Sequence, residues 1–184
     1  MEVQQYFIDL GLPPSLVIII IAAMPVIELR GAIPVAINIL DTPWLPAFFL
    51  AIIGNMLPVP FILRLLHWLT NSLSRYRLCK RFFDWTFTRT KARSGVIEQY
   101  KKLGLTLFVA VPIPLTGAWT GAIAVVILGI PLRDAMQHIF FGVVIAGVIV
   151  TALSLMGWYG AIIAGLALSS ATVITTLRRR KVQS

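Results

Sequence analysis

The chain has 184 residues, of which 58% are hydrophobic and only 12% are charged. A water-soluble domain carries about 25% charged residues, so this composition excludes an ordinary soluble protein. Residues 47–63, 103–130 and 139–177 contain no charge, and such runs need lipid or a protein interior around them. The sequence therefore predicts an all-α integral membrane protein that forms a single transmembrane domain, 1–184.

The net charge of +9 comes from two basic blocks. Nine Lys and Arg residues lie within residues 71–102, against Asp84 and Glu98, and four more occupy residues 178–181. Basic blocks beside apolar spans are what the positive-inside bias produces. We therefore expect a multi-pass protein of the cell inner (cytoplasmic) membrane, with the loop 71–102 and the C-terminus cytoplasmic. Membrane lipids are then the partners of these charges, and no nucleic acid is expected.

The first apolar segment, 13–39, predicts a re-entrant helical hairpin. Its uncharged run from Leu16 to Ile27 has 12 residues, which would cover only ~18 Å as a helix, well short of a ~30 Å hydrocarbon core. Glu28 and Arg30 follow, and then a second apolar run begins. We place the tip of this hairpin at Glu28–Gly31, near the middle of the membrane, with both arms entering from the outer face.

The segment 47–70 predicts a transmembrane span, kinked where Pro58 and Pro60 remove backbone donors. The loop 71–102 follows on the cytoplasmic side. The segment 103–130 then repeats the broken pattern of the first, with prolines and glycines between two short apolar arms. Broken backbone is tolerated in a membrane only where protein or a water-filled cavity covers it.

Two further spans, 136–156 and 157–177, are separated by the glycine-aromatic sequence 157–160. These spans cross the membrane and return, and the basic tail that follows them is cytoplasmic. The segment 103–130 must therefore enter and leave on the same side. It is accordingly predicted to be a second re-entrant hairpin, which enters from the cytoplasmic face.

A shift of 86 residues aligns the two hairpin segments. Of the eight positions compared within 27–32 and 36–37, six are identical to the residues 86 positions later. This pattern predicts an inverted-topology repeat of two units, each a re-entrant hairpin plus a transmembrane helix, with 157–177 as an additional C-terminal transmembrane helix. Transporters of this plan bind their substrates at the midplane, between the repeats. Chance similarity among apolar residues is the alternative.

Glu28 and Arg30 are the first candidates for a binding site, because ionisable residues at membrane depth usually face a cavity or a partner. The alternative is an ion pair that only fastens the hairpins together. On a helix the i,i+2 spacing would point the two side chains apart, so mutual pairing needs a bent tip. In both hairpins a second arm is expected just after the tip, at 31–34 and 117–120. Its N-terminus favours an anion, so with Arg30 the pattern predicts a bound phosphate or carboxylate, and Glu28 would load and release a proton.

Neighbouring polar residues extend this predicted site. Thr116 and Thr120 can donate to the same ligand, or bond back to their own turn, which is the commoner case. Asn55 needs a partner at depth and is more often a packing residue, and Trp119 either lines the pocket or packs against its neighbours. The predicted substrate-binding residues are Glu28, Arg30, Gly31, Pro34, Asn55, Pro114, Thr116, Gly117, Trp119 and Thr120.

Other kinds of site find no support in the sequence. Neither His67 nor His138 has companions at metal-ligand spacing. No Ser/His/Asp set, phosphate-binding Gly-Lys loop or dinucleotide fingerprint is present. We therefore expect no metal, no cofactor and no catalytic residue, so the protein is not expected to be an enzyme.

Three motifs carry a resemblance to a known family: ELRGAIP at 28–34, GNMLPVP at 54–60 and VPIPLTGAWTG at 111–121. They resemble the motifs of the small multidrug export protein family of prokaryotic membrane proteins, over roughly residues 10–175. The alternation of hairpins and spans is also similar to the DedA-like superfamily. That resemblance implies a flippase or scramblase of lipids, polyprenyl phosphates included, which requires acidic and basic hairpin residues. This chain has Pro114 and Thr116 where an arginine-bearing motif would be expected.

These observations together predict a transporter or flippase for a small amphipathic substrate that is anionic or lipid-linked, such as a polyprenyl phosphate or a phospholipid. Protons are an expected partner through Glu28. Two alternatives stay open. One is an exporter of cationic drugs with Glu28 as the cation site. The other is a non-transporting membrane assembly protein, in which the glycine-rich faces of 136–177 contact other helices, and such faces also leave a homo-oligomer open.

Overall fold

The structure, a computed structural model, describes residues 11–73, 95–113, 116–157, 159–160 and 162, and the regular elements in these ranges are α-helices. Among these described residues, two stretches are long and apolar enough to cross a membrane, Trp44–Leu69 and Leu132–Leu155. The second stretch has 24 residues, which at 1.5 Å per residue gives a length of about 36 Å. That length exceeds a ~30 Å hydrocarbon core. The prediction of an all-helical protein is confirmed for the described residues, and by length and composition these two stretches could cross a membrane.

Helices α2 (Pro14–Ala23) and α3 (Glu28–Asn38) form the first hairpin, and they pack against each other. A proline suits the first position of α2 because its missing N–H would have no helical acceptor there. The connection consists of residues 24–27, so the predicted tip at Glu28–Gly31 is one turn too late. Glu28 is the first residue of α3, and its backbone is left-handed, with φ 52. Pro34 lies inside α3 and not in its first turn.

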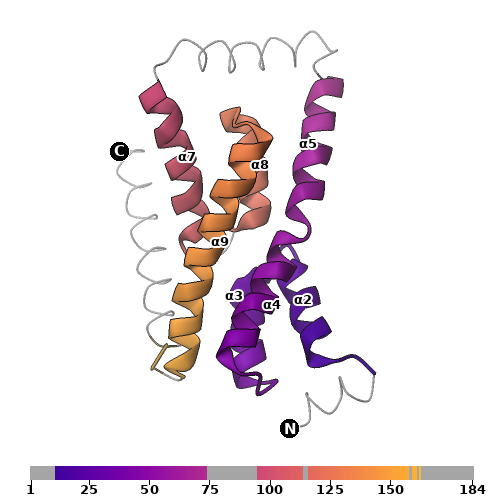
Figure 1. The fold of residues 1–184 in the computed structure, drawn as a ribbon, viewed down its shortest axis with the longest axis vertical. Coiled ribbons are helices and arrows are strands. Elements are labelled where there is room, and N and C mark those ends of the chain that lie inside the picture. Colours follow the sequence, from indigo (N-terminus) through magenta and orange to yellow (C-terminus); the bar gives the residue numbers. More distant parts are fainter. Residues whose placement is uncertain (1–10, 74–94, 114–115, 158, 161, 163–184) are drawn as a thin grey trace, which may run out of the picture.

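Helices α4 (Trp44–Met56) and α5 (Val59–Leu73) form the predicted kinked span. The break at residues 57–58 is confirmed, because Pro58 and Pro60 cannot donate to the helical ladder. The two helices belong to different ends of the molecule (Figure 1): α4 packs on α2 and α3, whereas α5 packs on α8.

Helices α7 (Gly95–Ala110) and α8 (Ala118–Leu128) form the second hairpin. These two helices overlap the hairpin predicted at 103–130, whose re-entrant course in a membrane stays a prediction. The predicted loop 71–102 is partly wrong, since α5 continues to Leu73 and α7 begins at Gly95. The basic residues at the end of that range have partners within the helical part. Lys101 donates to the carbonyl of Leu128 at 3.2 Å, and Lys102 pairs with Asp134 at 2.6 Å. The rest of the loop, 74–94, lies outside the described residues.

Helix α9 (Leu132–Leu155) runs along the length of the molecule and contacts both hairpins (Figure 1). It begins four residues before the predicted 136, directly after Pro131. A Cβ added at Gly142 would lie 2.7 Å from Cβ of Val109, so α7 and α9 approach closely there. The predicted span 157–177 lies outside the described residues, except for 157, 159, 160 and 162.

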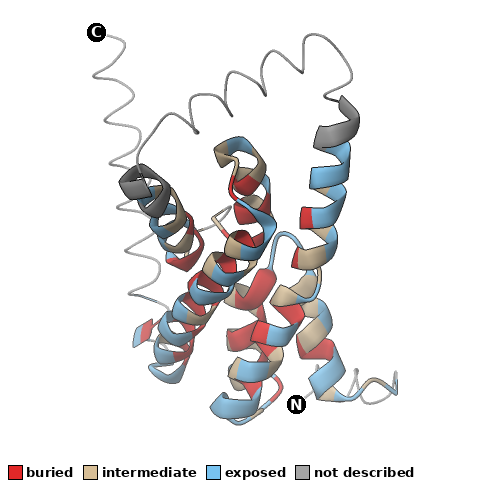
Figure 2. Ribbon diagram, turned by 45° about the horizontal axis from the view of Figure 1, so that its top comes forward, coloured by how far each residue is buried: buried red, intermediate tan, exposed pale blue. Residues whose placement is uncertain are grey.

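The buried residues, red in Figure 2, lie where α9, the two hairpins and the kinked span α4–α5 pack together. The largest fully buried apolar side chains are Ile18, Leu29, Ile33, Val59, Leu63, Leu105, Val109, Ile139 and Val143. Large apolar side chains also lie on the outer faces, where Phe49 is 54% and Phe61 is 66% exposed. An apolar outer surface of this kind suits helices that face lipid.

Candidate functional site

The candidate site begins at Glu28, the first residue of α3. Glu28 is only 3% exposed, and its backbone is left-handed, with φ 52. A left-handed backbone costs a non-glycine residue about 1–2 kcal/mol, so the surroundings must hold it in place. The bend has a direct result: Nη1 of Arg30 donates to Oε2 of Glu28 at 2.5 Å. The i,i+2 pair therefore forms, as the bent tip allows.

The second hairpin supplies the remaining acceptors of Arg30. Its Nη2 donates to the carbonyl oxygens of Val109 at 3.1 Å and Val111 at 3.0 Å. Both carbonyls lie where α7 ends, and helix ends leave carbonyls without helical donors. A cation at a helix C-terminus also meets the negative end of the helix dipole. The guanidinium group thus fastens the first hairpin onto the end of α7.

The carboxylate of Glu28 occupies the N-terminus of α8. Its Oε1 accepts the backbone N–H of Trp119 at 3.4 Å. A Cβ added at Gly117 would overlap the carboxylate group, so a residue without a side chain is required there. The positive end of α8 favours an anion, and the anion that the structure places there is Glu28.

Trp119 fastens the two hairpins at a second point. Its Nε1 donates to the carbonyl of Ala23 at 3.3 Å. Ala23 is the last residue of α2, and its carbonyl is one of those that a helix end leaves free. Trp119 therefore contacts both arms of the first hairpin, through its backbone on Glu28 and through its side chain on Ala23.

The two threonines bond mainly to their own turns. Oγ1 of Thr116 lies 2.8 Å from the carbonyl oxygens of both Val111 and Ile113, and Oγ1 of Thr120 donates to Gly117 at 3.2 Å. Thr116 also accepts Nη2 of Arg30 at 3.4 Å. Arg30 and Thr116 are 86 positions apart, so these two residues occupy equivalent positions in the aligned hairpins.

Of the predicted site residues, the structure brings Glu28, Arg30, Thr116, Gly117 and Trp119 together. Gly31 lies in the first turn of α3, where an added Cβ would overlap the side chain of Ile27. Asn55 is fully buried on α4, and neither atom of its amide has a hydrogen-bond partner among the described residues. Pro114 lies outside those residues.

Sequence reasoning missed the main-chain acceptors of the site, which are the carbonyls of Ala23, Val109 and Val111. A carbonyl oxygen carries no side-chain signature, so the types of these residues gave no signal. The prolines at 112 and 114 were the available sign, because prolines mark where a helix ends and its last carbonyls become free.

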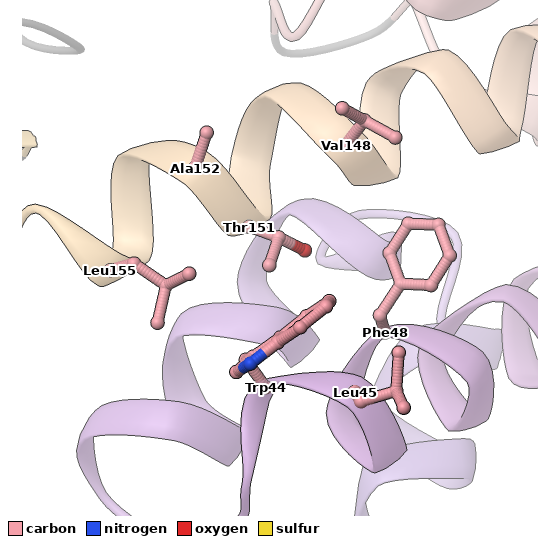
Figure 3. A pocket seen from close by; sticks show the side chains of 7 residues that line it. All are labelled: Trp44, Leu45, Phe48, Val148, Thr151, Ala152 and Leu155. Carbon is pink, nitrogen blue, oxygen red and sulfur yellow. The ribbon is translucent and has the colours of Figure 1, made fainter.

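An apolar groove of about 310 Å³ lies apart from this site, between α4 and α9. Trp44, Leu45 and Phe48 line it from α4, and α9 contributes the other four side chains (Figure 3). One of them, Thr151, is 5% exposed, and its hydroxyl has no partner in the described structure. None of these residues is among the predicted substrate-binding residues.

The described part of the chain holds no cluster of three His, Cys, Asp or Glu side chains that could bind a metal ion. The family model described as "Putative small multi-drug export protein" matches residues 28–149, a range that begins at Glu28 and includes the second hairpin. No curated protein and no solved structure matches the chain.

Proposed function

Because the chain belongs to the family of small multi-drug export proteins, we propose that it is a multi-pass transporter of the inner (cytoplasmic) membrane. Its proposed substrate is small and amphipathic, with an anionic or lipid-linked head such as a polyprenyl phosphate or a phospholipid. The family description names export and leaves the substrate open, so the preference for an anion rests on the chemistry of the Glu28 site.

The two hairpins are proposed to be re-entrant and to form an inverted repeat. Helices α3 and α8 have 11 residues each, or about 17 Å, which is too short for a ~30 Å hydrocarbon core. The hairpins extend from opposite ends of the molecule toward its middle (Figure 1). The bond between Arg30 and Thr116 adds support, because residues related by a two-fold axis touch only close to that axis. In this arrangement the loop between α5 and α7 and the C-terminus are cytoplasmic.

One observation carries the proposal: Glu28 is buried and its partner Arg30 is half-buried, and residues of the second hairpin bind both. Charges at membrane depth are costly and are retained mainly where they act on a substrate, an ion or a proton. The groups that converge here are a guanidinium and the N-terminus of α8, and both favour an anion.

The geometry gives less support to a site for cationic drugs. A cation bound to Glu28 would have to replace Arg30, whose Nη2 is held by two carbonyls of the second hairpin. Leaving Arg30 without its carboxylate would also strand a buried charge, which costs about 3–5 kcal/mol. An anionic head replaces the carboxylate and keeps the guanidinium paired.

A liposome experiment tests the proposal. Purified wild type, Arg30→Gln and the control Arg133→Gln are reconstituted, and the movement of a short-chain polyprenyl phosphate between leaflets is followed. Glutamine cannot supply the positive charge, so the rate in Arg30→Gln should be at least tenfold lower than in the wild type, while expression stays normal. A tenfold lower rate corresponds to about 1.4 kcal/mol. Arg133 is exposed at the start of α9, so its variant should keep the wild-type rate.

Three outcomes would contradict the proposal. A wild-type rate of polyprenyl phosphate movement in Arg30→Gln would show that Arg30 does not bind the substrate. Ethidium transport by the wild type that is lost in Glu28→Gln would show that the protein is an exporter of cations. Reconstituted protein that moves neither probe under any gradient would favour the assembly protein.

A further inference from the structure

Resting on the transport function proposed above, we infer that the Glu28 carboxylate is a built-in occupant of the substrate's anion site. A proton and a monoanionic headgroup then bind together, and the protein carries them across the membrane as a neutral pair. The class of substrate follows: amphiphiles with one negative charge on the head, such as phosphodiesters, sulfates or singly ionised phosphates.

Two of the donors that would bind an anionic head are donors that Glu28 uses, and Nε of Arg30 is a buried donor without a partner in the described structure. Arg30 donates to one carboxylate oxygen at 2.5 Å, and the N–H of Trp119 points to the other at 3.4 Å. Gly117 leaves only enough room for this one group, since even a methyl group there would overlap it. With Glu28 only 3% exposed, an incoming anion has no place beside the carboxylate and must take its position.

Charge balance then links the anion to a proton. The pair of Glu28 and Arg30 is neutral, and a second anion would leave one negative charge without compensation in a buried site, which is strongly unfavourable. A proton bound to Glu28 turns its carboxylate into a neutral acid, so Arg30 and the N–H of Trp119 become available. A monoanion that binds them restores neutrality. One proton and one negative charge therefore enter and leave the site together.

Apart from Arg30 on its own helix, no titratable group in the described structure faces Glu28 from the helices packed around it. Helices α2, α4 and α8 contain no titratable side chain. On α9 the titratable residues lie in its first two turns, where Asp134 pairs with Lys102 and Nδ1 of His138 lies 2.9 Å from Oγ1 of Thr106. Helix α7 reaches the site through uncharged carbonyls. The proton dependence of anion binding therefore belongs to Glu28, with Arg30 as its charged partner.

The first test uses the wild-type protein in liposomes, with protein-free liposomes as the blank. The probe is radiolabelled hexyl sulfate, which keeps its single negative charge at every pH used. A more acidic outer solution should drive accumulation inside, by about tenfold at equilibrium for each pH unit. A potassium-valinomycin potential without a pH difference should drive none, because the transported pair is neutral. Uptake that follows the potential and ignores the pH difference would overturn the inference.

The second test replaces the acid by a neutral group of the same shape. Glu28→Gln imitates the protonated state, so it should still exchange external for internal hexyl sulfate, at a rate that no longer depends on pH. It should lose the accumulation driven by a pH difference, down to an inside-to-outside ratio of one. The control Asp134→Asn makes the same chemical change outside the site and should accumulate the probe as the wild type does.

The outcomes separate this inference from the function on which it rests. Wild-type protein that exchanges hexyl sulfate without any effect of pH would overturn the inference and leave the transport function standing. Wild-type protein that moves neither hexyl sulfate nor polyprenyl phosphate would overturn both. A folded Glu28→Gln protein without exchange would show that the carboxylate is required for anion binding, contrary to the inference, and if that variant does not fold, the wild-type measurement decides.

Discussion

The two hairpins share one plan and differ at their tips. Helices α3 and α8 have the same length of 11 residues, and each follows a short non-helical connection. The first hairpin presents the charges of Glu28 and Arg30. At the two equivalent positions the second has Pro114 and Thr116, and its contribution is carbonyls, a hydroxyl and a helix N-terminus. One hairpin thus carries the charged groups, and the other provides the groups that bind them.

The starting points of the two helices explain this difference. Glu28 begins α3 with a left-handed backbone, whereas α8 begins only at Ala118, which aligns with Ala32 in the first hairpin. The second hairpin therefore has one helical turn less at its tip. Arg30 donates to two carbonyls at the C-terminal end of α7, those of Val109 and Val111. A pair of similar hairpins can build an asymmetric site by unwinding one turn in a single copy.

Exchanging the two equivalent residues is the strongest test of this comparison. Arg30→Thr alone leaves Glu28 buried without its cation and should cost about 3–5 kcal/mol of stability. Adding Thr116→Arg should recover more than half of that loss, because the hydroxyl of Thr116 already lies 3.4 Å from Nη2 of Arg30. Thermal unfolding in detergent of both single variants and the double variant measures the coupling. Strictly additive losses would mean that the two positions are not interchangeable.

Gly117→Ala should have the next largest effect. The added methyl group overlaps the Glu28 carboxylate, and forced rearrangements of a packed interior cost about 1–3 kcal/mol. We expect the rate of polyprenyl phosphate movement to fall at least tenfold, where tenfold corresponds to about 1.4 kcal/mol. Gly104→Ala is the matched control, because a Cβ there meets nothing within 4 Å and alanine favours a helix. Equal activity of the two variants would show that the tips do not touch at Gly117.

Trp119→Phe should have the smallest effect, since it removes only the indole donor and keeps most of the ring. Loss of the bond to the carbonyl of Ala23 should lower stability by about 0.5–1.5 kcal/mol. Trp44→Phe serves as the control, because Trp44 is 50% exposed at the start of α4. The measurement is the difference in melting temperature between Trp119→Phe and Trp44→Phe. Equal melting temperatures would show that the bond to Ala23 does not stabilise the protein.

Features of the fold that depend on covalent chemistry were predictable from the sequence. Pro58 and Pro60 lack an N–H, so the break between α4 and α5 follows from their identity alone. The break between α7 and α8 was predictable because Gly117 and the prolines before it interrupt an apolar run. The pairing of Glu28 with Arg30 was one of two alternatives that the sequence left open, and its condition, a bent tip, was stated in advance.

Features that depend on tertiary contacts were not predictable. The tip of the first hairpin was placed one turn too late, because nothing in the residue type of Glu28 indicates a left-handed backbone, which α8 and Arg30 hold in place. The start of α7 was missed because Lys101 and Lys102 read as loop residues. Their partners, the carbonyl of Leu128 and Asp134, lie on elements about 30 residues away in the chain.

The distance along the chain between Glu28, Arg30 and their partners has a consequence for synthesis. The bonds of this pair to the second hairpin span 79 to 91 residues, so the ribosome completes the first hairpin long before its acceptors exist. During that interval the nascent hairpin carries two charges that lipid cannot solvate. We therefore expect it to wait at the membrane surface or inside the insertion machinery, and to reach its final depth only when α8 arrives.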